Sequence, residues 1–144
     1  MDFGAVYNGY HSDITRTICV GKASDKQREI YNAVLNAQMY GLEVIKVGVG
    51  GKAIDEKVRE RLKSLGYGDY FTHSLGHSLG LNIHEEPRLS PLSKCERLEV
   101  NMLVTDEPGV YIPNFGGVRI EDTVLVTQYG ALPLTKSPKK LLEI

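Results

Sequence analysis

The Asn8-Gly9 dipeptide constrains the fold of this chain most strongly, because strand-like runs flank it across residues 2–18. Asn-Gly between two such runs predicts a β-hairpin, since a type I′ turn needs a positive φ angle at both central residues. With these two residues at the turn, Tyr7 is expected to pair with Tyr10.

This register brings two carboxylates to one face of the hairpin. Gly4 is expected to pair with Asp13, and Asp2 shares a strand face with Gly4 because side chains alternate with a period of two. Asp2 and Asp13 are then diagonal neighbours, with Cα atoms roughly 7–8 Å apart. Either a cation relieves their repulsion, or both aspartates face solvent near a sheet edge.

Two helices are predicted after the hairpin. Ser24 and Gln27 form a capping-box pattern at the start of a helix that continues to about residue 46. A second helix is expected over about 53–65, with Gly66 at the position where a left-handed residue ends a helix. The buried faces are expected to hold Ile30, Val34, Ala37 and Gly41 in the first helix, and Ile54, Val58, Leu62 and Leu65 in the second.

The remainder of the chain is predicted as strand and loop. A glycine-interrupted strand is expected over residues 70–83, and a proline-containing polar loop over 87–97. Strands are expected over 98–107 and 118–126, with a loop between them and a turn-like tail from residue 128. This order of elements predicts an α+β fold, with helices on one face of an antiparallel sheet.

Two glutamates stand in the last two predicted strands. Glu107 ends the first, and Glu121 interrupts an apolar run in the second, where strand propensity disfavours a glutamate. Val118, Ile120 and Val124 indicate that this strand is at least half buried. Glu121 is therefore either a surface residue on the opposite face or part of a site that requires a charge.

Three of the four histidines lie close together in the sequence: His73, His77 and His84. His73 and His77 share strand parity, so both are expected to face one cleft. Gly76 and Gly80 would let backbone or ligand approach closely. A lone histidine is more often a hydrogen-bonded core residue, but three so close together favour a site.

The carboxylates and one imidazole make an oxygen-rich set of metal ligands: Asp2, Asp13, His77, Glu107 and Glu121. Two divalent cations would balance the four carboxylates, and the donor types suit Mn²⁺, Co²⁺, Fe²⁺ or Zn²⁺. Two ions roughly 3.5–4 Å apart polarise a carbonyl group and activate water, so the chemistry indicated is hydrolysis.

Composition argues against several other classes of protein. The 144 residues are 42% hydrophobic and 24% charged, with a net charge of −1 and no basic run that would favour nucleic acid or a membrane surface. No apolar run has transmembrane length, and no signal segment opens the chain. Cys19 and Cys95 lack metal-type spacing and are expected to be reduced, as in a cytoplasmic protein.

A series of ordered motifs spans essentially the whole chain. They are Asp2-Phe3-Gly4-Ala5, Gly9-Tyr10-His11-Ser12-Asp13-Ile14-Thr15-Arg16-Thr17, His73-Ser74-Leu75-Gly76-His77, Ile83-His84-Glu85-Glu86-Pro87, Glu107-Pro108-Gly109-Val110-Tyr111 and Gly116-Gly117-Val118-Arg119-Ile120-Glu121-Asp122-Thr123. Together they resemble the pita-bread metallopeptidases, which include methionine aminopeptidases, Xaa-Pro aminopeptidases and prolidases. The resemblance implies two metal ions, Mn²⁺ or Co²⁺ before Zn²⁺ or Fe²⁺, bound by the five residues named above, with Asp13 and Glu121 bridging.

The resemblance also implies roles in binding and cleaving a peptide substrate. Glu107 matches the family's proton shuttle, and His73 and His84 match histidines that line the substrate site and help to stabilise the tetrahedral intermediate. Arg119 matches a residue that supports the bridging glutamate and the proline-specific site.

The motifs around Glu107 and Arg119 resemble the Xaa-Pro aminopeptidase and prolidase branch. The expected function is release of an N-terminal residue linked to proline by an Xaa-Pro aminopeptidase, with an Xaa-Pro dipeptidase (prolidase) as the alternative. A non-catalytic peptide-binding module and a creatinase-like hydrolase without metal are further alternatives. The intact set of ligands argues against both.

Two residues depart from the family pattern. Ser78 stands where glycine is common, and Asp106 replaces an apolar residue and either raises the pKa of Glu107 or points away from it. The family's catalytic domain also has elements before the first metal aspartate. Residues 1–144 are therefore expected to be the C-terminal part of a metallopeptidase catalytic domain, with an exposed apolar face covered by an N-terminal portion or by a second copy in a homo-oligomer.

Overall fold

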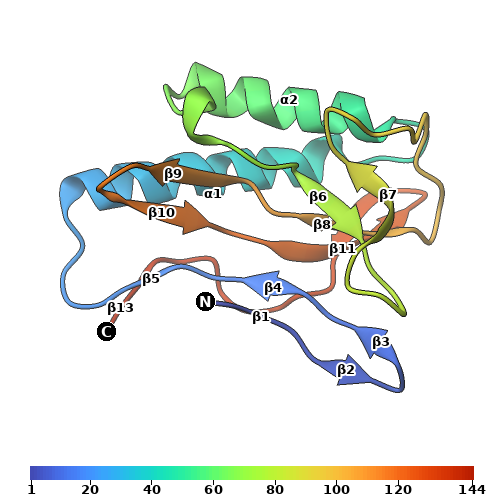
Figure 1. Ribbon diagram of the computed structural model, residues 1–144, viewed down its shortest axis with the longest axis horizontal. Helices are drawn as coiled ribbons and strands as arrows, with labels where there is room; N and C mark the ends of the chain where they lie inside the picture. Colours follow the sequence, from blue (N-terminus) through green and yellow to red (C-terminus); the bar gives the residue numbers. More distant parts are fainter.

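Two helices lie along one side of a layer of short, mostly antiparallel strands, and the first hairpin lies on the other side (Figure 1). The computed structural model describes residues 1–144. Its elements are β1 (Asp2–Phe3), β2 (Val6–Tyr7), β3 (Tyr10–His11), β4 (Ile14–Thr15), β5 (Ile18–Cys19), α1 (Asp25–Val44), α2 (Gly51–Ser64), the 3-10 helix η1 (Gly68–Tyr70), β6 (Gly76–Ser78), β7 (Glu85–Leu89), β8 (Leu103–Asp106), β9 (Gly109–Ile112), β10 (Gly116–Arg119), β11 (Asp122–Thr127), β12 (Gly130–Pro133) and β13 (Leu142–Glu143). The predicted α+β class is confirmed. Neither helix has both the length and the apolar character needed to cross a membrane.

The first hairpin follows the predicted register. Asn8 and Gly9 have φ angles of 50° and 84°, as a type I′ turn requires. Tyr7 pairs with Tyr10, and further along the same register Asp2 pairs with Thr15. The predicted hairpin is therefore confirmed from its turn to its open end.

The helices begin and end close to their predicted positions. The Ser24 hydroxyl accepts the Gln27 N–H at 3.2 Å, and the Gln27 side chain accepts the Ser24 N–H at 2.8 Å, which completes the predicted capping box. α2 ends at Ser64, and Gly66 follows with a φ angle of 85°. Leu65 was expected on the buried face, but it caps the helix and is exposed.

The chain between α2 and β8 differs from the prediction. Only β6 is a strand within residues 70–83, because side chains of α2, rather than a neighbouring strand, hold the residues before it. The loop predicted from residue 87 begins later, since β7 continues through Pro87. β7 pairs with β6 across an irregularity at His77–Ser78, and a bulge is one of the few places where a strand accepts proline.

The C-terminal strands are shorter and more numerous than predicted. Only β8 forms within 98–107, and the predicted loop over 108–117 contains β9, which pairs with β10 as a hairpin. The predicted strand 118–126 is split into β10 and β11, and the tail contains β12 and β13. Ile120 and Glu121 are consecutive and both buried, which an unbroken half-buried strand does not allow.

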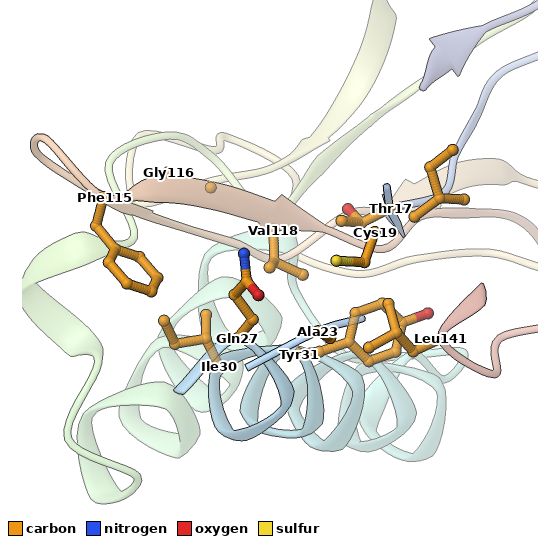
Figure 2. A pocket seen from close by; sticks show the side chains of 12 residues that line it. Thr17, Cys19, Ala23, Gln27, Ile30, Tyr31, Phe115, Gly116, Val118 and Leu141 are labelled. Carbon is orange, nitrogen blue, oxygen red and sulfur yellow. The ribbon is translucent and has the colours of Figure 1, made fainter. Parts of the chain in front are cut away.

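A small apolar cavity of about 110 Å³ lies between the start of α1 and the β9–β10 hairpin (Figure 2). The side chains of Thr17, Gln27 and Tyr31 line it and already form hydrogen bonds within the chain. None of the predicted site residues lines this cavity, so it has no part in the predicted site.

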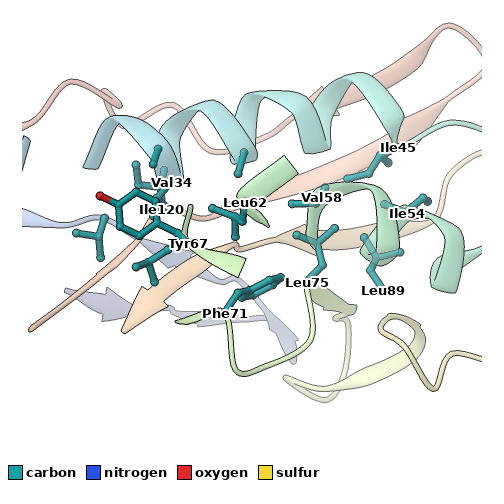
Figure 3. Packing of buried hydrophobic residues seen from close by; sticks show 14 of the residues in the cluster. Val34, Ile45, Ile54, Val58, Leu62, Tyr67, Phe71, Leu75, Leu89 and Ile120 are labelled. Carbon is teal, nitrogen blue, oxygen red and sulfur yellow. The ribbon is translucent and has the colours of Figure 1, made fainter. Parts of the chain in front are cut away.

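The hydrophobic core lies between the helices and the strands (Figure 3). Val34 of α1 and Val58 and Leu62 of α2 are fully buried in it. Leu75 and Ile120 fill it from the strand side and are also fully buried. The two helices thus form one apolar support beneath the residues that flank His73, His77 and Glu121.

A polar network lies between α1 and the strands. The Gln38 amide donates to Asp106 at 3.2 Å and to Asp122 at 3.1 Å, and Asp122 also accepts from Arg16 at 2.8 Å and Lys139 at 2.6 Å. Asp106 is fully buried, and its burial and the neighbouring Asp122 raise its pKa. Of the two predicted alternatives, Asp106 points away from the metal ligands, toward α1.

Gly41 is the point at which α1 approaches this network most closely. A Cβ atom at this position would lie 2.3 Å from an Asp106 carboxylate oxygen. Replacing glycine by alanine in an exposed helix interior stabilises the fold by about 1 kcal/mol, whereas overpacking a buried site destabilises it by about 1–3 kcal/mol.

We predict that Gly41→Ala lowers the free energy of unfolding in urea. Asn32→Ala, at an exposed position of the same helix, is the control and should leave stability unchanged or higher; a stabilised Gly41→Ala variant would contradict the packing.

Candidate metal centre

Ligand-type atoms of Asp13, His77 and Glu121 all lie within 4.8 Å of one another. The His77 Nε2 atom is 3.7 Å from Asp13 Oδ2 and 3.3 Å from Glu107 Oε1. Asp13 lies between β3 and β4, His77 lies in β6, Glu107 directly follows β8, and Glu121 lies between β10 and β11. The structure therefore brings four of the five predicted ligands together.

Gly76 makes this convergence possible. A Cβ atom at Gly76 would lie 2.0 Å from the Thr105 carbonyl oxygen, so only glycine lets β6 approach β8 this closely. The Thr105 hydroxyl accepts the His77 backbone N–H at 3.0 Å and donates to Glu107 Oε1 at 2.9 Å. Thr105 thus holds two predicted ligands, a role that the sequence analysis missed because a threonine in a strand carries no specific signal.

The imidazole of His77 is oriented for binding a metal through one nitrogen. Its Nδ1 lies 3.0 Å from the Ser78 carbonyl oxygen, which can only accept a hydrogen bond, so the ring proton resides on Nδ1. Nε2 then carries no proton, and its lone pair, which can bind a metal, faces Asp13 and Glu107. Burial lowers the pKa of His77, which keeps the ring neutral, as a metal ligand must be.

Thr15 holds Glu121, which the resemblance assigns as a bridging ligand. Its hydroxyl donates to Glu121 Oε2 at 2.6 Å and accepts from the Arg119 Nε–H at 3.1 Å. Arg119, which the resemblance assigns to the support of Glu121, therefore reaches that residue through Thr15. Glu121 itself is buried, so the surface alternative considered from the sequence is wrong.

Asp2 lies outside the close group. Its carboxylate pairs with Arg119, and its side chain is 55% exposed. The charge of Asp2 nevertheless contributes to raising the pKa values of Asp13, Glu107 and Glu121. Asp2 is thus electrostatically part of the centre, although its side chain is turned to the arginine.

The carboxylates of this centre hold protons unusually strongly. Burial, with smaller contributions from Asp13 and Asp2, raises the pKa of Glu107 to about 7. Burial and the neighbouring Glu107 raise the pKa of Glu121 to about 8. A bound cation would stabilise these carboxylates in their charged form. The oxygen atoms and the imidazole nitrogen are also ligand types that divalent cations accept.

A cleft of about 300 Å³ opens beside these ligands and contains the predicted substrate residues His73, His84 and Arg119. His77 and Glu107 also line it, so His73 and His77 do face one cleft as predicted. The ring of His84 lies 4.3 Å from that of His77, in an edge-on arrangement.

Tyr111 joins two sides of this cleft. Its hydroxyl lies 2.9 Å from His73 Nε2 and accepts from Arg119 Nη1 at 2.8 Å. The other nitrogen of His73 lies 2.8 Å from the Ser74 carbonyl oxygen, so both ring nitrogens are engaged within the chain. The sequence motifs predicted no role for Tyr111, and they did not predict that Ser74 and Arg88 line the cleft.

Comparison with known proteins identifies the family. The sequence pattern of metallopeptidase family M24 matches residues 1–128. The chain belongs to this family. Membership implies divalent metal ions, in agreement with the donor set.

The M24 chain is 56% identical to the Xaa-Pro dipeptidase of Pyrococcus furiosus over 99% of its own length and 40% of that protein. Among solved structures, the Xaa-Pro dipeptidase from Bacillus anthracis superposes with a TM-score of 0.96 at 55% identity, covering 99% of this chain and 40% of that one. An X-Pro aminopeptidase from Thermotoga maritima has a TM-score of 0.95 at 40% identity, with the same coverage. The chain thus has the expected pita-bread fold and spans about 40% of the length of these relatives.

The raised pKa values predict how the stability of the metal-free protein depends on pH. A carboxyl group whose pKa is higher in the folded than in the unfolded protein stabilises the fold while it is protonated. This contribution is complete below the ordinary glutamate value of 4.5 and is lost as the pH rises through about 7 for Glu107 and about 8 for Glu121. The melting temperature without metal should therefore fall by roughly 5–10 °C between pH 5 and pH 9.

Calorimetry with and without Mn²⁺ measures this effect. Mn²⁺ should restore most of the lost stability at pH 9 and add less at pH 5, where protons compete for the same oxygens. Glu107→Gln and Glu121→Gln should each flatten the pH dependence of the metal-free protein. A metal-free melting temperature that rises over this pH range would refute the assignment.

Proposed function

We propose that this M24 chain provides the metal centre and part of the substrate cleft of an Xaa-Pro dipeptidase. The function expected first from the sequence is that of an Xaa-Pro aminopeptidase, and the comparisons favour the alternative, an Xaa-Pro dipeptidase. Relatives named Xaa-Pro dipeptidase are 56% and 49% identical to the chain, whereas a structure named X-Pro aminopeptidase is 40% identical and one named aminopeptidase P is 30% identical.

The observation that carries the proposal is the convergence of buried carboxylates on one neutral imidazole. Asp13, His77, Glu107 and Glu121 would hold two divalent ions, and Asp2 would be the fifth ligand once its carboxylate turns from Arg119. We favour Mn²⁺ or Co²⁺ as the bound ions. Bound ions of this kind polarise a carbonyl group and lower the pKa of water.

The protein's own groups would move the proton and orient the peptide. Glu107, held by Thr105, would accept a proton from the attacking water and return it to the proline nitrogen as the peptide bond breaks. His84 is exposed at the edge of the cleft and would donate to the developing oxyanion. His73 would act differently from the family-based expectation, because both its nitrogens are engaged and it instead holds the Tyr111 hydroxyl at the cleft wall.

A paired assay tests the substrate class. The protein is freed of metal by dialysis against a chelator, supplied with Mn²⁺ or Co²⁺, and incubated with an Xaa-Pro dipeptide and with a tripeptide that starts with Xaa-Pro. We expect the dipeptide to be cleaved faster, and activity to disappear again with chelator. Preferential cleavage of the tripeptide would favour the aminopeptidase. No turnover of either peptide, despite two bound ions per chain, would refute the enzymatic proposal.

Glu107→Gln separates proton transfer from metal binding. Glutamine keeps the shape of the side chain and an oxygen that can bind a metal, but it cannot carry a proton. We expect kcat to fall at least ~100-fold. The number of bound ions, measured by elemental analysis, should fall much less. A variant with the wild-type rate would exclude Glu107 as the proton shuttle.

A further inference from the structure

The segment that carries His73 has no strand partner, although it forms one wall of the cleft. It runs from Phe71 to Leu75, and both of these end residues are buried in the core (Figure 3). Hydrophobic burial fixes the two ends of the segment, but it does not determine the position or orientation of the backbone at His73. Another set of contacts must do so.

Two charged residues of α2 supply these contacts. Arg59 donates from Nη1 to the Phe71 carbonyl at 2.8 Å and from Nη2 to the His73 carbonyl at 3.0 Å. Asp55 accepts the Leu75 backbone N–H at 2.9 Å. Three backbone groups, evenly spaced along the segment, are therefore held from one turn of the helix.

The two side chains also hold each other. Arg59 Nε and Nη2 donate to the two oxygens of Asp55, each at 3.1 Å, in a bidentate pair between residues i and i+4. The Asp55 side chain is fully buried, and a buried carboxylate is tolerated only when it is paired and hydrogen-bonded. The guanidinium further lies 4.3 Å from the centre of the Phe71 ring, which meets the His73 ring edge-on at 5.1 Å.

We propose that Asp55 and Arg59 are positioning residues, which set the placement of His73 in the cleft wall and, through it, of the Tyr111 hydroxyl that His73 and Arg119 share. The role in turnover depends on the proposed peptidase function, whereas the placement of His73 does not. The planar fork of arginine is essential, because one side chain must bind a carboxylate and two separate carbonyl oxygens together. Lysine keeps the charge, but its three N–H donors share one nitrogen atom, which cannot span the Asp55 carboxylate and both carbonyl oxygens.

The helix contains a matched control. Lys52 and Glu56 form an i,i+4 pair on α2 at 3.8 Å, but both side chains are more than half exposed, and no hydrogen bond or ion pair joins them to the Phe71–Leu75 segment. The double variant Lys52→Gln/Glu56→Gln removes an ion pair of the same spacing from the same helix. Any effect specific to the Asp55–Arg59 pair must be absent from this control.

The test compares Arg59→Lys and Asp55→Asn with the control by NMR and kinetics. Arg59→Lys leaves Asp55 a neighbouring charge and is expected to fold, and Asp55→Asn keeps the shape of the side chain. We expect the His73 ring resonances to shift and broaden in both variants, and to stay unchanged in the control. With an Xaa-Pro dipeptide, kcat should fall about 10- to 100-fold while KM changes less than about 3-fold.

A cycle with His73→Ala distinguishes positioning from general support of the fold. If Arg59 acts through His73, Arg59→Lys should lower kcat far less in the His73→Ala background than in the wild type. Equal losses in both backgrounds, or unchanged His73 resonances in Arg59→Lys, would overturn the proposal. If the wild type cleaves no peptide, the proposed function fails, and the resonances alone decide whether the pair positions His73.

Discussion

The burial of several carboxylates close to one another is the constraint on which the rest of the site depends. Asp13, Glu107 and Glu121 crowd around one imidazole, and burial makes each of them a poor anion unless a proton or a cation is nearby. The surrounding hydroxyl groups do not neutralise this charge. Thr15 and Thr105 instead fix the directions of individual carboxylate oxygens. The arrangement keeps the predicted ligand atoms pointed at a common centre, although this crowding lowers the stability of the metal-free fold.

The scaffold separates two tasks between its two helices. α1 lies over the Asp106–Asp122 network, whose hydrogen bonds anchor β8 and β11 and so hold Glu107 and Glu121, one residue from each aspartate, in their places. α2 holds the backbone around His73 with a paired Asp55 and Arg59. The predicted ligands Glu107 and Glu121 and the predicted substrate residue His73 therefore depend on different helices, both packed on one apolar core.

The sequence predicted what depends on local conformation and missed what depends on distant contacts. Asn8-Gly9 determined the hairpin register because few turn types allow a positive φ angle at two consecutive residues. The capping box set the start of α1 because its hydrogen bonds form only between residues three apart at a helix N-terminus. The strands around Pro87 and in residues 108–117 were missed, because a bulge and a short hairpin depend on their partners more than on propensity. Of the site, the ligand types and the shared cleft were predictable. The pairing of Asp2 with an arginine far along the chain was not.

The hydrogen bond from His77 Nδ1 to the Ser78 carbonyl has a consequence for how freely this site can vary. In many metal sites the acceptor that sets the tautomer of a ligand histidine is a carboxylate, which one substitution can remove. Here the acceptor belongs to the main chain and is present whichever residue occupies position 78. The tautomer of His77, a proposed metal ligand, therefore does not depend on which side chain occupies position 78. Serine in place of the family's usual glycine can be neutral for metal binding, provided that its hydroxyl fits the space.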